Sequence, residues 1–254
     1  METGALTSYL DVAQLVLYMF WIFFAGLVYY LVRENHREGY PLEKEEGRSS
    51  AVKGWPIPQP KTYRLAHGGE FSAPNDKVSQ RTLALEPAHA WRGAPLVPTG
   101  AKPMLDGVGP GSWVERADVP DLDFEGTIKI VPLRMATDFS ISGKDADPRG
   151  LPVVGDDGEV GGTVVDLWVD KAESLFRYIE VELTGGARRV LLPMNFARIR
   201  KDRVAVKSIL GHQFADVPGT RSADQVTQLE EEKIVAYFGA GTLYAEPSRV
   251  DPLI

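Results

Sequence analysis

The sequence contains no cysteine, which excludes disulfide bonds, thiolate catalysis and Cys-ligated zinc or iron–sulfur clusters. The four histidines show no metal-ligand spacing, and no nucleophile elbow, phosphate loop or HExxH motif is present. The Gly-rich stretch GVGPG at 107–111 lacks the flanking strand and helix of a phosphate loop, so we interpret it as a turn. These absences predict a chain with no catalytic site of its own.

Basic residues are fewer than acidic ones: the chain has 28 Lys and Arg and 35 Asp and Glu, which gives a net charge of −7. A domain that binds nucleic acid needs a basic surplus to neutralise phosphates. We therefore expect protein and lipid partners and no nucleic acid.

One stretch carries no charge at all. Residues 12–32, VAQLVLYMFWIFFAGLVYYLV, contain Gln14 as the only strongly polar side chain. A helix of this length spans roughly 31 Å, which matches the roughly 30 Å hydrocarbon core of a bilayer. Buried helices of soluble proteins are rarely apolar all round over this length. The sequence therefore predicts a transmembrane helix over 12–32.

The residues that flank this stretch predict its orientation. The first 11 residues contain no Lys or Arg, whereas four follow the stretch by residue 48, so the positive-inside rule places residues 1–11 on the outer side of the membrane. The same lack of basic residues, and the absence of a cleavage site, argue against a signal peptide. We expect a single-pass protein with a cytoplasmic C-terminal part.

Residues 33–120 differ from the apolar stretch in composition, because they are rich in proline. The helix should end near Gly39 and Pro41, and residues 41–120 hold 11 of the 18 prolines. Proline fixes φ and removes a backbone donor, which favours extended chain. Disorder is the alternative, but the segment keeps large apolar side chains that disordered linkers usually lack. We predict an extended segment draped on partner subunits. These side chains are Trp55, Tyr63, Phe71, Trp91 and Trp113.

Residues 121–254 are predicted to form the main domain, because short alternating strands recur at intervals of about ten residues. Ile179 and Val181 should face inward, and Tyr178 and Glu180 outward. A helix is predicted near 226–238, ended by Gly239. The fold class is therefore a single N-terminal transmembrane α-helix plus a mainly-β (α+β) domain with a small barrel or rolled sheet. Its strands are predicted at 160–170, 175–183, 188–192 and 203–209.

Acidic side chains gather at two places in this domain. Four carboxylates crowd within residues 118–125, and Asp170 and Glu173 flank a turn, with Arg177 four residues later. A solvated acidic surface is the simpler interpretation. The alternative is a proton relay, because carboxylates that pack together away from water acquire raised and spread pKa values.

Several motifs, in order along nearly the whole chain, resemble the H subunit of the purple-bacterial photosynthetic reaction centre. The resemblance implies a PRC-type β-barrel in the cytoplasmic domain and a subunit that is not an enzyme. Short pieces such as LLPM are not specific, but the ordered set behind one transmembrane helix is. The motifs are ENHREGYPLE (34–43), DGVGPGSWV (106–114), GLPV (150–153), VVDLWVD (164–170), IEVEL (179–183), LLPM (191–194) and LEEEKI (229–234).

The resemblance also implies partners and a location. The family's helix packs against the L and M subunits in the bacterial inner, intracytoplasmic photosynthetic membrane, and its cytoplasmic domain shields the quinones. L and M carry the bacteriochlorophylls, bacteriopheophytins, quinones, non-haem iron and carotenoid, and H binds no cofactor or metal. Membrane lipids, a light-harvesting antenna and a cytochrome subunit are further expected partners.

By motif, the family's proton-transfer carboxylates correspond to Asp123, Asp170 and Glu173. Their charged neighbours are Lys129 and Arg177. The best-known members carry two histidines in the stretch that here reads DFEGT (123–127), at positions that correspond to Glu125 and Thr127. This departure puts a His-based proton uptake point and surface metal binding in doubt. Glu125 could substitute as a proton donor but not as an imidazole ligand.

Two other functions compete with this one. A membrane-anchored PRC-barrel could serve as a binding module of another assembly, such as an RNA-processing one, although the acidic charge and the Pro-rich segment count against it. A tethered hydrolase is disfavoured because no catalytic triad or metal motif is present.

Overall fold

The computed structural model describes residues 5–7, 10–40, 43–44, 47–51, 57–66, 68–75, 81–91, 94–186 and 188–250. The chain divides into two compact units, residues 1–80 and residues 81–254. The predicted domain boundary lies after residue 120, whereas the two units divide after residue 80. The 3-10 helices within 103–111 contact helix 228–244 and so belong to the second unit. We describe each unit by itself.

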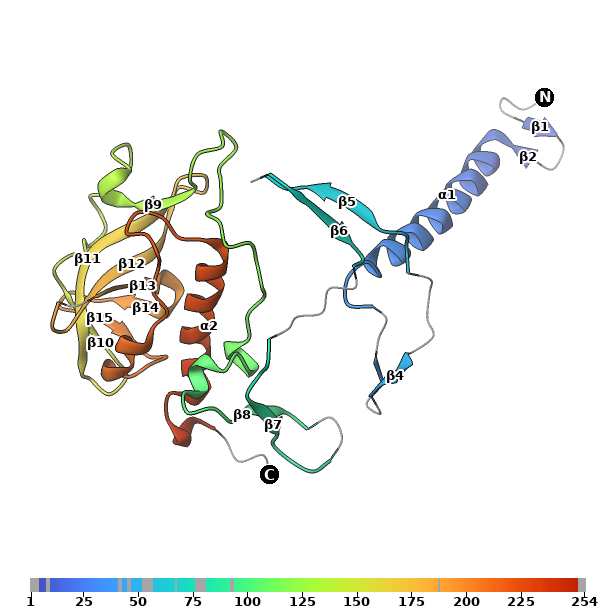
Figure 1. The fold of residues 1–254 in the computed structure, drawn as a ribbon. Coiled ribbons are helices and arrows are strands. Elements are labelled where there is room, and N and C mark those ends of the chain that lie inside the picture. Colours follow the sequence, from blue (N-terminus) through green and yellow to red (C-terminus); the bar gives the residue numbers. More distant parts are fainter. Residues whose placement is uncertain are drawn as a thin grey trace. The chain divides into compact units, whose positions relative to one another are not determined.

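Helix α1, Val12–Asn35, dominates the first unit (Figure 1). Asp11 caps it by accepting a hydrogen bond from the Gln14 N–H, His36 closes it, and Gly39 follows with φ of +74°. None of its side chains is buried, and Ile22 is 74% exposed. Because an apolar helix exposed all round is unstable in water, it must be covered by lipid or by another protein. It is long and apolar enough to cross a membrane.

The other strands described in the first unit form short antiparallel pairs. Arg37, just beyond α1, donates hydrogen bonds to the carbonyls of Gln59 and Ala73. It also forms an ion pair with Glu34, in which Arg37 Nε lies 2.7 Å from Glu34 Oε2. These contacts join the helix end to one of the hairpins. The strands are β1 (Ala5–Thr7) with β2 (Leu10–Asp11), β3 (Glu43–Lys44) with β4 (Gly47–Ala51), and β5 (Lys61–Arg64) with β6 (Glu70–Ala73).

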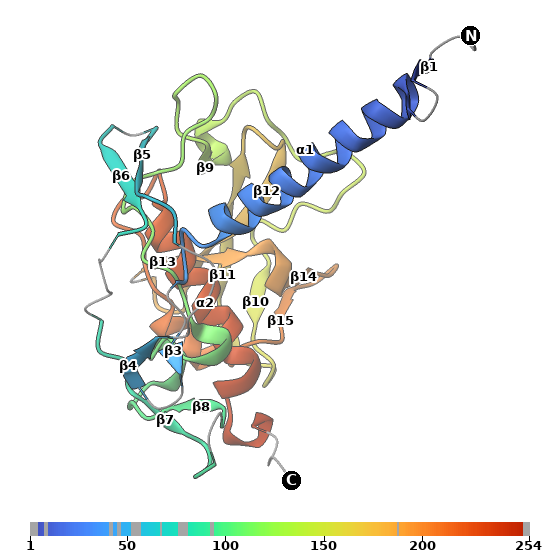
Figure 2. The same ribbon diagram turned by 90° about the vertical axis from the view of Figure 1, so that its right-hand side faces the viewer.

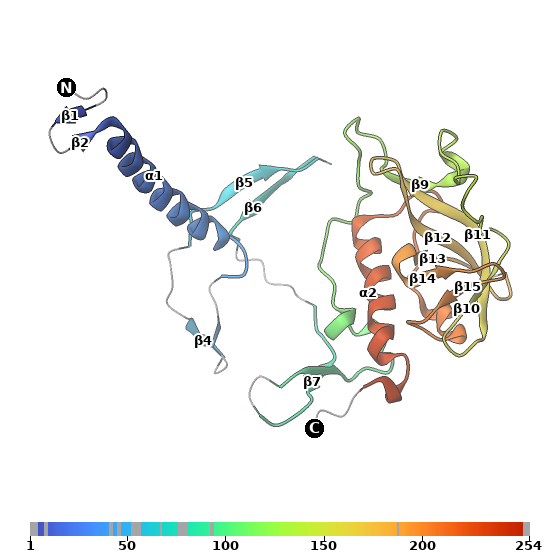
Figure 3. The same ribbon diagram turned by 180° about the vertical axis from the view of Figure 1, so that it is seen from behind.

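The second unit is built on a curled seven-stranded sheet with the order β13-β12-β11-β10-β15-β14 (Figures 1 and 3). The long strand β11 is central: β12 pairs with one side, while β10 and β9 share the other. The predicted strands at 160–170 and 175–183 are confirmed, and 203–209 shortens to Val204–Val206. The strands are β9 (Ile130–Pro132), β10 (Pro152–Val154), β11 (Val160–Asp170), β12 (Leu175–Leu183), β13 (Arg189–Pro193), β14 (Ala197–Ile199) and β15 (Val204–Val206).

Smaller elements complete the unit. The Gly-rich turn predicted at 107–111 contains a short 3-10 helix, in agreement with the turn interpretation. The hairpin of β7 (Leu85–Pro87) and β8 (Leu96–Pro98) precedes it. The 3-10 helices are η1 (Pro103–Leu105), η2 (Gly109–Gly111), η3 (Leu133–Met135), η4 (Met194–Phe196), η5 (Gly211–Asp216) and η6 (Pro247–Arg249).

The core lies between the curled sheet and helix α2, Gln228–Tyr244, which Figures 1 and 3 show beside the sheet. Thr227 and Glu230 form a capping box at its start. Ile179, Ile234 and Phe238 are 0% exposed, and fully burying a side chain of this size contributes about 1.5–3 kcal/mol. The predicted inward face of β12 is thus confirmed, and α2 packs against it through Ile234 and Phe238.

The predicted end of this helix at Gly239 is wrong: α2 continues through Gly239 and Gly241 to Tyr244. A Cβ on Gly239 would lie 2.6 Å from the Pro110 carbonyl oxygen, and one on Gly241 would lie 2.4 Å from the Ser208 carbonyl oxygen. These glycines therefore allow neighbouring backbone to approach the helix closely.

Candidate functional site

Four of the six predicted site residues meet at one end of the sheet. Lys129 directly precedes β9, Asp170 is the last residue of β11, and Arg177 lies in β12. The register places Asp170 opposite Ile130 of β9 and opposite Leu175 of β12. The hairpin of β11 and β12 brings Asp170, Glu173 and Arg177 together, and the pairing of β9 with β11 adds Lys129, which is far away in the sequence.

Asp170 is the centre of this cluster. Its side chain is 0% exposed and lies 3.4 Å from the Lys129 ammonium and 3.2 Å from the Arg177 Nε. Its Oδ1 also accepts hydrogen bonds from the backbone N–H groups of Ala172 and Glu173. A buried carboxylate is tolerated only when it is paired and hydrogen-bonded, as Asp170 is.

Glu173 lies next to Asp170 and reaches the surface. It contacts the same two cations, Lys129 at 3.4 Å and Arg177 at 3.0 Å, but its side chain is 47% exposed. Burial disfavours both cations, yet the neighbouring carboxylates outweigh it and raise the pKa values of Lys129 and Arg177. A buried carboxylate is thus connected to a half-exposed one through shared cations.

Asp123 forms a separate cluster with Thr127 and Lys171. The Thr127 hydroxyl and backbone N–H donate to its carboxylate, and the Lys171 ammonium lies 3.3 Å away. The bond from the Thr127 hydroxyl is the largest cause that lowers the pKa of Asp123 to about 2, so this carboxylate stays charged at neutral pH. The backbone N–H of Lys171 donates to the Lys129 carbonyl, which places this cluster beside the first.

The Glu125 side chain lies in neither cluster, although its backbone N–H donates to the Asp123 carboxylate at 3.1 Å. Its side chain is exposed and forms no ion pair or hydrogen bond with another described residue. Thr127, at the second position where relatives carry histidine, instead accepts a hydrogen bond from the Lys171 ammonium. The two departures from the family pattern therefore lie in different environments.

Sequence reasoning left several neighbours out of the site. Asp121 lies 3.8 Å from the Lys129 ammonium. Glu231 of α2 accepts a hydrogen bond from the Tyr178 hydroxyl at 2.7 Å, and burial raises the pKa of both groups. The acidic run 118–125 was a signal for Asp121. No local pattern could place the start of α2 against β12.

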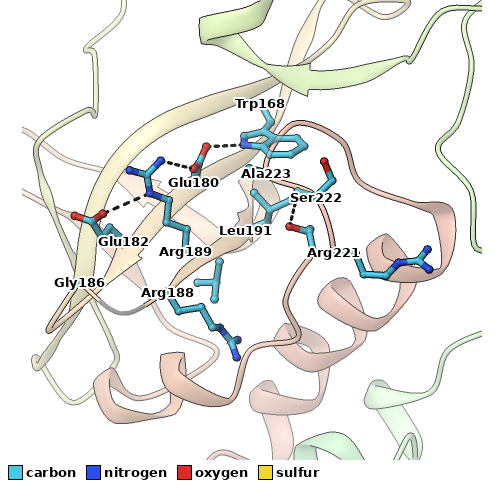
Figure 4. A pocket seen from close by; sticks show the side chains of 12 residues that line it. Trp168, Glu180, Glu182, Gly186, Arg188, Arg189, Leu191, Arg221, Ser222 and Ala223 are labelled. Atoms are coloured by element: carbon cyan, nitrogen blue, oxygen red, sulfur yellow. Dashed lines mark hydrogen bonds and ion pairs between the residues drawn. The ribbon is translucent and has the colours of Figure 1, made fainter.

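Burial corrects the prediction that Glu180 and Tyr178 face outward: Tyr178 is 4% exposed beside Glu231, and Glu180 belongs to a second polar network. Glu180 is 3% exposed and accepts hydrogen bonds from Arg134 Nη1 at 2.6 Å and from the Trp168 ring N–H at 3.0 Å. Arg189 Nη1 donates to Glu180 Oε1 at 3.2 Å, and Arg189 lines a pocket of about 500 Å³ (Figure 4). Both faces of β12 are covered, so alternation alone misassigns the outer one.

One group of possible metal ligands occurs among the described residues. Ligand atoms of Asp157, Glu159 and His212 lie within 4.8 Å of one another. All three are exposed, and Asp157 already accepts the Gly211 N–H. Because exposed acidic groups of this kind are common without a metal, we assign no metal site.

In chemical terms, the Asp170 cluster joins three carboxylates to two cations. The carboxylates are Asp121, Asp170 and Glu173. One is fully buried and two are partly exposed. Such an arrangement can pass a proton between solvent and the protein interior, because ionisable side chains in contact with one another offer successive positions for it.

Two comparisons with known families bear on this arrangement. Residues 4–135 match the photosynthetic reaction centre H-chain N-terminal region, which covers more than half of the chain. Residues 143–213 match the PRC-barrel domain, and they include β10–β15, most of the curled sheet.

Proposed function

Because the chain belongs to the H-chain family of photosynthetic reaction centres, we propose that it caps the quinone side of the membrane core and supports proton transfer to the secondary quinone. The family is a structural subunit of a light-driven complex and associates with the L and M subunits. The apolar helix α1 fits a membrane anchor.

The observation that supports the proton-transfer proposal is the pairing of buried Asp170 with half-exposed Glu173 through Lys129 and Arg177. Reducing a quinone to a quinol takes two electrons and two protons. Protons do not cross a dry protein layer without ionisable groups to carry them. Asp170 and Glu173 are suitable carriers. Asp123, which stays charged at neutral pH, supports the transfer by its negative charge beside them rather than by binding the proton. Exposed Glu125 is a candidate proton collector at the surface.

The proposal extends to the rest of the assembly. The pigments, quinones, carotenoid and non-haem iron belong to L and M, and this chain binds none of them. Its cap keeps water from the quinones, which slows leakage from charged intermediates. An antenna and a cytochrome subunit are further partners in the same intracytoplasmic membrane.

Removing this chain from the purified complex tests the proposal. The complex should absorb in the near infrared with or without the chain. Flash spectroscopy should show unchanged primary charge separation and a second electron transfer slowed about tenfold or more, the lower range of general acid–base effects. A colourless preparation would contradict the assembly, and an unchanged second transfer would contradict the proton-transfer role.

We further propose that residues 1–11 are periplasmic and that the chain beyond α1 is cytoplasmic. The asymmetry of Lys and Arg around α1 supports this orientation. Protease added to sealed inside-out vesicles should digest most of the chain, while right-side-out vesicles should protect it. Protection of residues 41–254 in the inside-out vesicles would reverse the proposed orientation.

A membrane-anchored PRC-barrel module of another assembly remains the competing function. The PRC-barrel match alone would permit it. The match over residues 4–135 is to a region described for reaction-centre H chains, and this favours the photosynthetic complex.

A further inference from the structure

The hairpin of β5 and β6 in the first unit has one mainly apolar face and one polar face. Its register pairs Tyr63 with Phe71 and Lys61 with Ala73. Because side chains alternate between the two faces of a strand, these four share one face. Leu65 follows β5, still bonds across the hairpin and continues the same face. The opposite face consists of Thr62, Arg64, Glu70 and Ser72.

The large side chains of the apolar face are left open by the described part of the chain. Tyr63, Leu65 and Phe71 are 44%, 45% and 42% exposed. The two aromatic residues also line a pocket of about 480 Å³, which they share with Glu34 and Arg37 at the end of α1. A two-stranded hairpin by itself is marginally stable in water, and an exposed apolar face marks a contact surface. The face therefore needs a cover.

Contacts with α1 fix this hairpin at the end of the apolar helix. Arg37 donates to the Ala73 carbonyl at 2.9 Å, and Lys61 Nζ lies 2.7 Å from Glu34 Oε2. The Lys61 ammonium also lies 5.6 Å from the ring centre of Tyr30, which belongs to the uncharged part of α1. Because Lys61 shares the apolar face, that face is turned toward the apolar part of the helix. Figures 1 and 2 show the hairpin running across the direction of α1.

We propose that hairpin β5–β6 lies in the membrane–water interface, with its apolar face covered by lipid. The uncharged part of α1 is long enough to cross the hydrocarbon core, so its end marks the boundary between acyl chains and headgroups. An element that leaves the helix there and runs across its direction follows the membrane surface. This inference rests on the membrane anchor in the proposed function and is independent of the proton-transfer role.

The chemistry of the two faces favours lipid over a protein cover. Aromatic rings, and tyrosine above all, are enriched where headgroups meet acyl chains. Lysine places its aliphatic stem along apolar surface while its ammonium stays in a polar layer, as Lys61 does between Tyr30 and Glu34. The opposite face, with two charges and two hydroxyls, is suited to water. Both sides of an interface are thus matched by one hairpin.

Spin labelling tests this placement directly, because the chain has no cysteine of its own. A nitroxide is attached to Leu65→Cys on the apolar face, to Arg64→Cys on the polar face, or to Ile22→Cys in α1. Electron paramagnetic resonance of the full-length chain in phosphatidylcholine–phosphatidylglycerol vesicles then measures access of oxygen, which concentrates in lipid, and of a water-soluble nickel chelate. The label at Leu65→Cys should lie about 5–10 Å below the headgroup boundary, with high oxygen and low nickel access. The label at Arg64→Cys should show the reverse.

A second substitution tests whether the apolar face causes the insertion. Phe71→Ser, added to the chain labelled at Leu65→Cys, should lower the ratio of oxygen access to nickel access toward the value at Arg64→Cys. Trp91→Ser removes an exposed aromatic ring from the second unit and should leave the ratio unchanged. Equal ratios at the two neighbouring label positions, or an unchanged ratio in Phe71→Ser, would overturn the proposal.

The label at Ile22→Cys reports on the anchor separately. Water access there would contradict the membrane anchor itself, whereas lipid access at Ile22→Cys with water access at Leu65→Cys would overturn only the placement of the hairpin. The same measurement on the intact complex in vesicles distinguishes lipid from a partner subunit. High oxygen access at Leu65→Cys in the complex supports the lipid cover. Loss of access to both reagents there would show that a partner subunit covers the face, and would overturn the proposal.

Discussion

Glu173→Gln is expected to slow the proton-coupled transfer of the second electron to the secondary quinone about tenfold or more, which is the lower range of general acid–base effects. Glutamine keeps the size of the side chain but cannot carry a proton. It also removes one negative charge from contact with Lys129 and Arg177. Primary charge separation should be unchanged, because it takes place between pigments of the L and M subunits. Flash spectroscopy of the intact complex measures the two steps separately.

Glu159→Gln provides the matched control for this experiment. Glu159 is exposed, precedes β11 at the end opposite Asp170, and forms no ion pair within the described part of the chain. Its replacement should leave both steps unchanged. A second-electron rate in Glu173→Gln equal to that of the unaltered complex between about pH 6 and 9, a range around neutral pH, would make Glu173 an ordinary surface charge.

Gly241→Ala is expected to destabilise the second unit by about 1–3 kcal/mol, the typical cost of overpacking. The added Cβ would lie 2.4 Å from the Ser208 carbonyl oxygen and 2.5 Å from Ile209 Cγ2. In a helix free of neighbours the same change would be stabilising by about 1 kcal/mol, because alanine has the higher helix propensity. The sign of the change therefore distinguishes packing from propensity. Thermal melting of the full-length chain in detergent, followed by circular dichroism, should fall by several degrees.

Gly143→Ala serves as the control for Gly241→Ala. Gly143 has no positive φ, and a Cβ there would meet no atom within 4 Å. Its melting temperature should stay close to that of the unaltered chain. A rise in the melting temperature of Gly241→Ala would show that α2 and the end of β15 are not in close contact.

The sequence alone was sufficient where the determining pattern is local. The uncharged stretch 12–32 predicted the apolar part of α1, and period-two alternation predicted β11 and β12 with their observed bounds. The spacing of Asp170, Glu173 and Arg177 around the turn between these strands predicted that the three side chains lie close together. The ordered motifs identified the family, which the matches over residues 4–135 and 143–213 confirm.

Tertiary structure decided whatever depends on contacts between distant segments. Gly239 and Gly241 would end a helix on propensity, but the close approach of Pro110 and Ser208 makes them part of α2. Alternation placed Glu180 outside, but Arg134 and Trp168 bury it by pairing with its carboxylate. Lys129 joins Asp170 only because β9 pairs with β11. Hydrophobic periodicity reports which face of an element is apolar, whereas strand pairing and packing across the fold determine which polar groups meet and which backbones must come close.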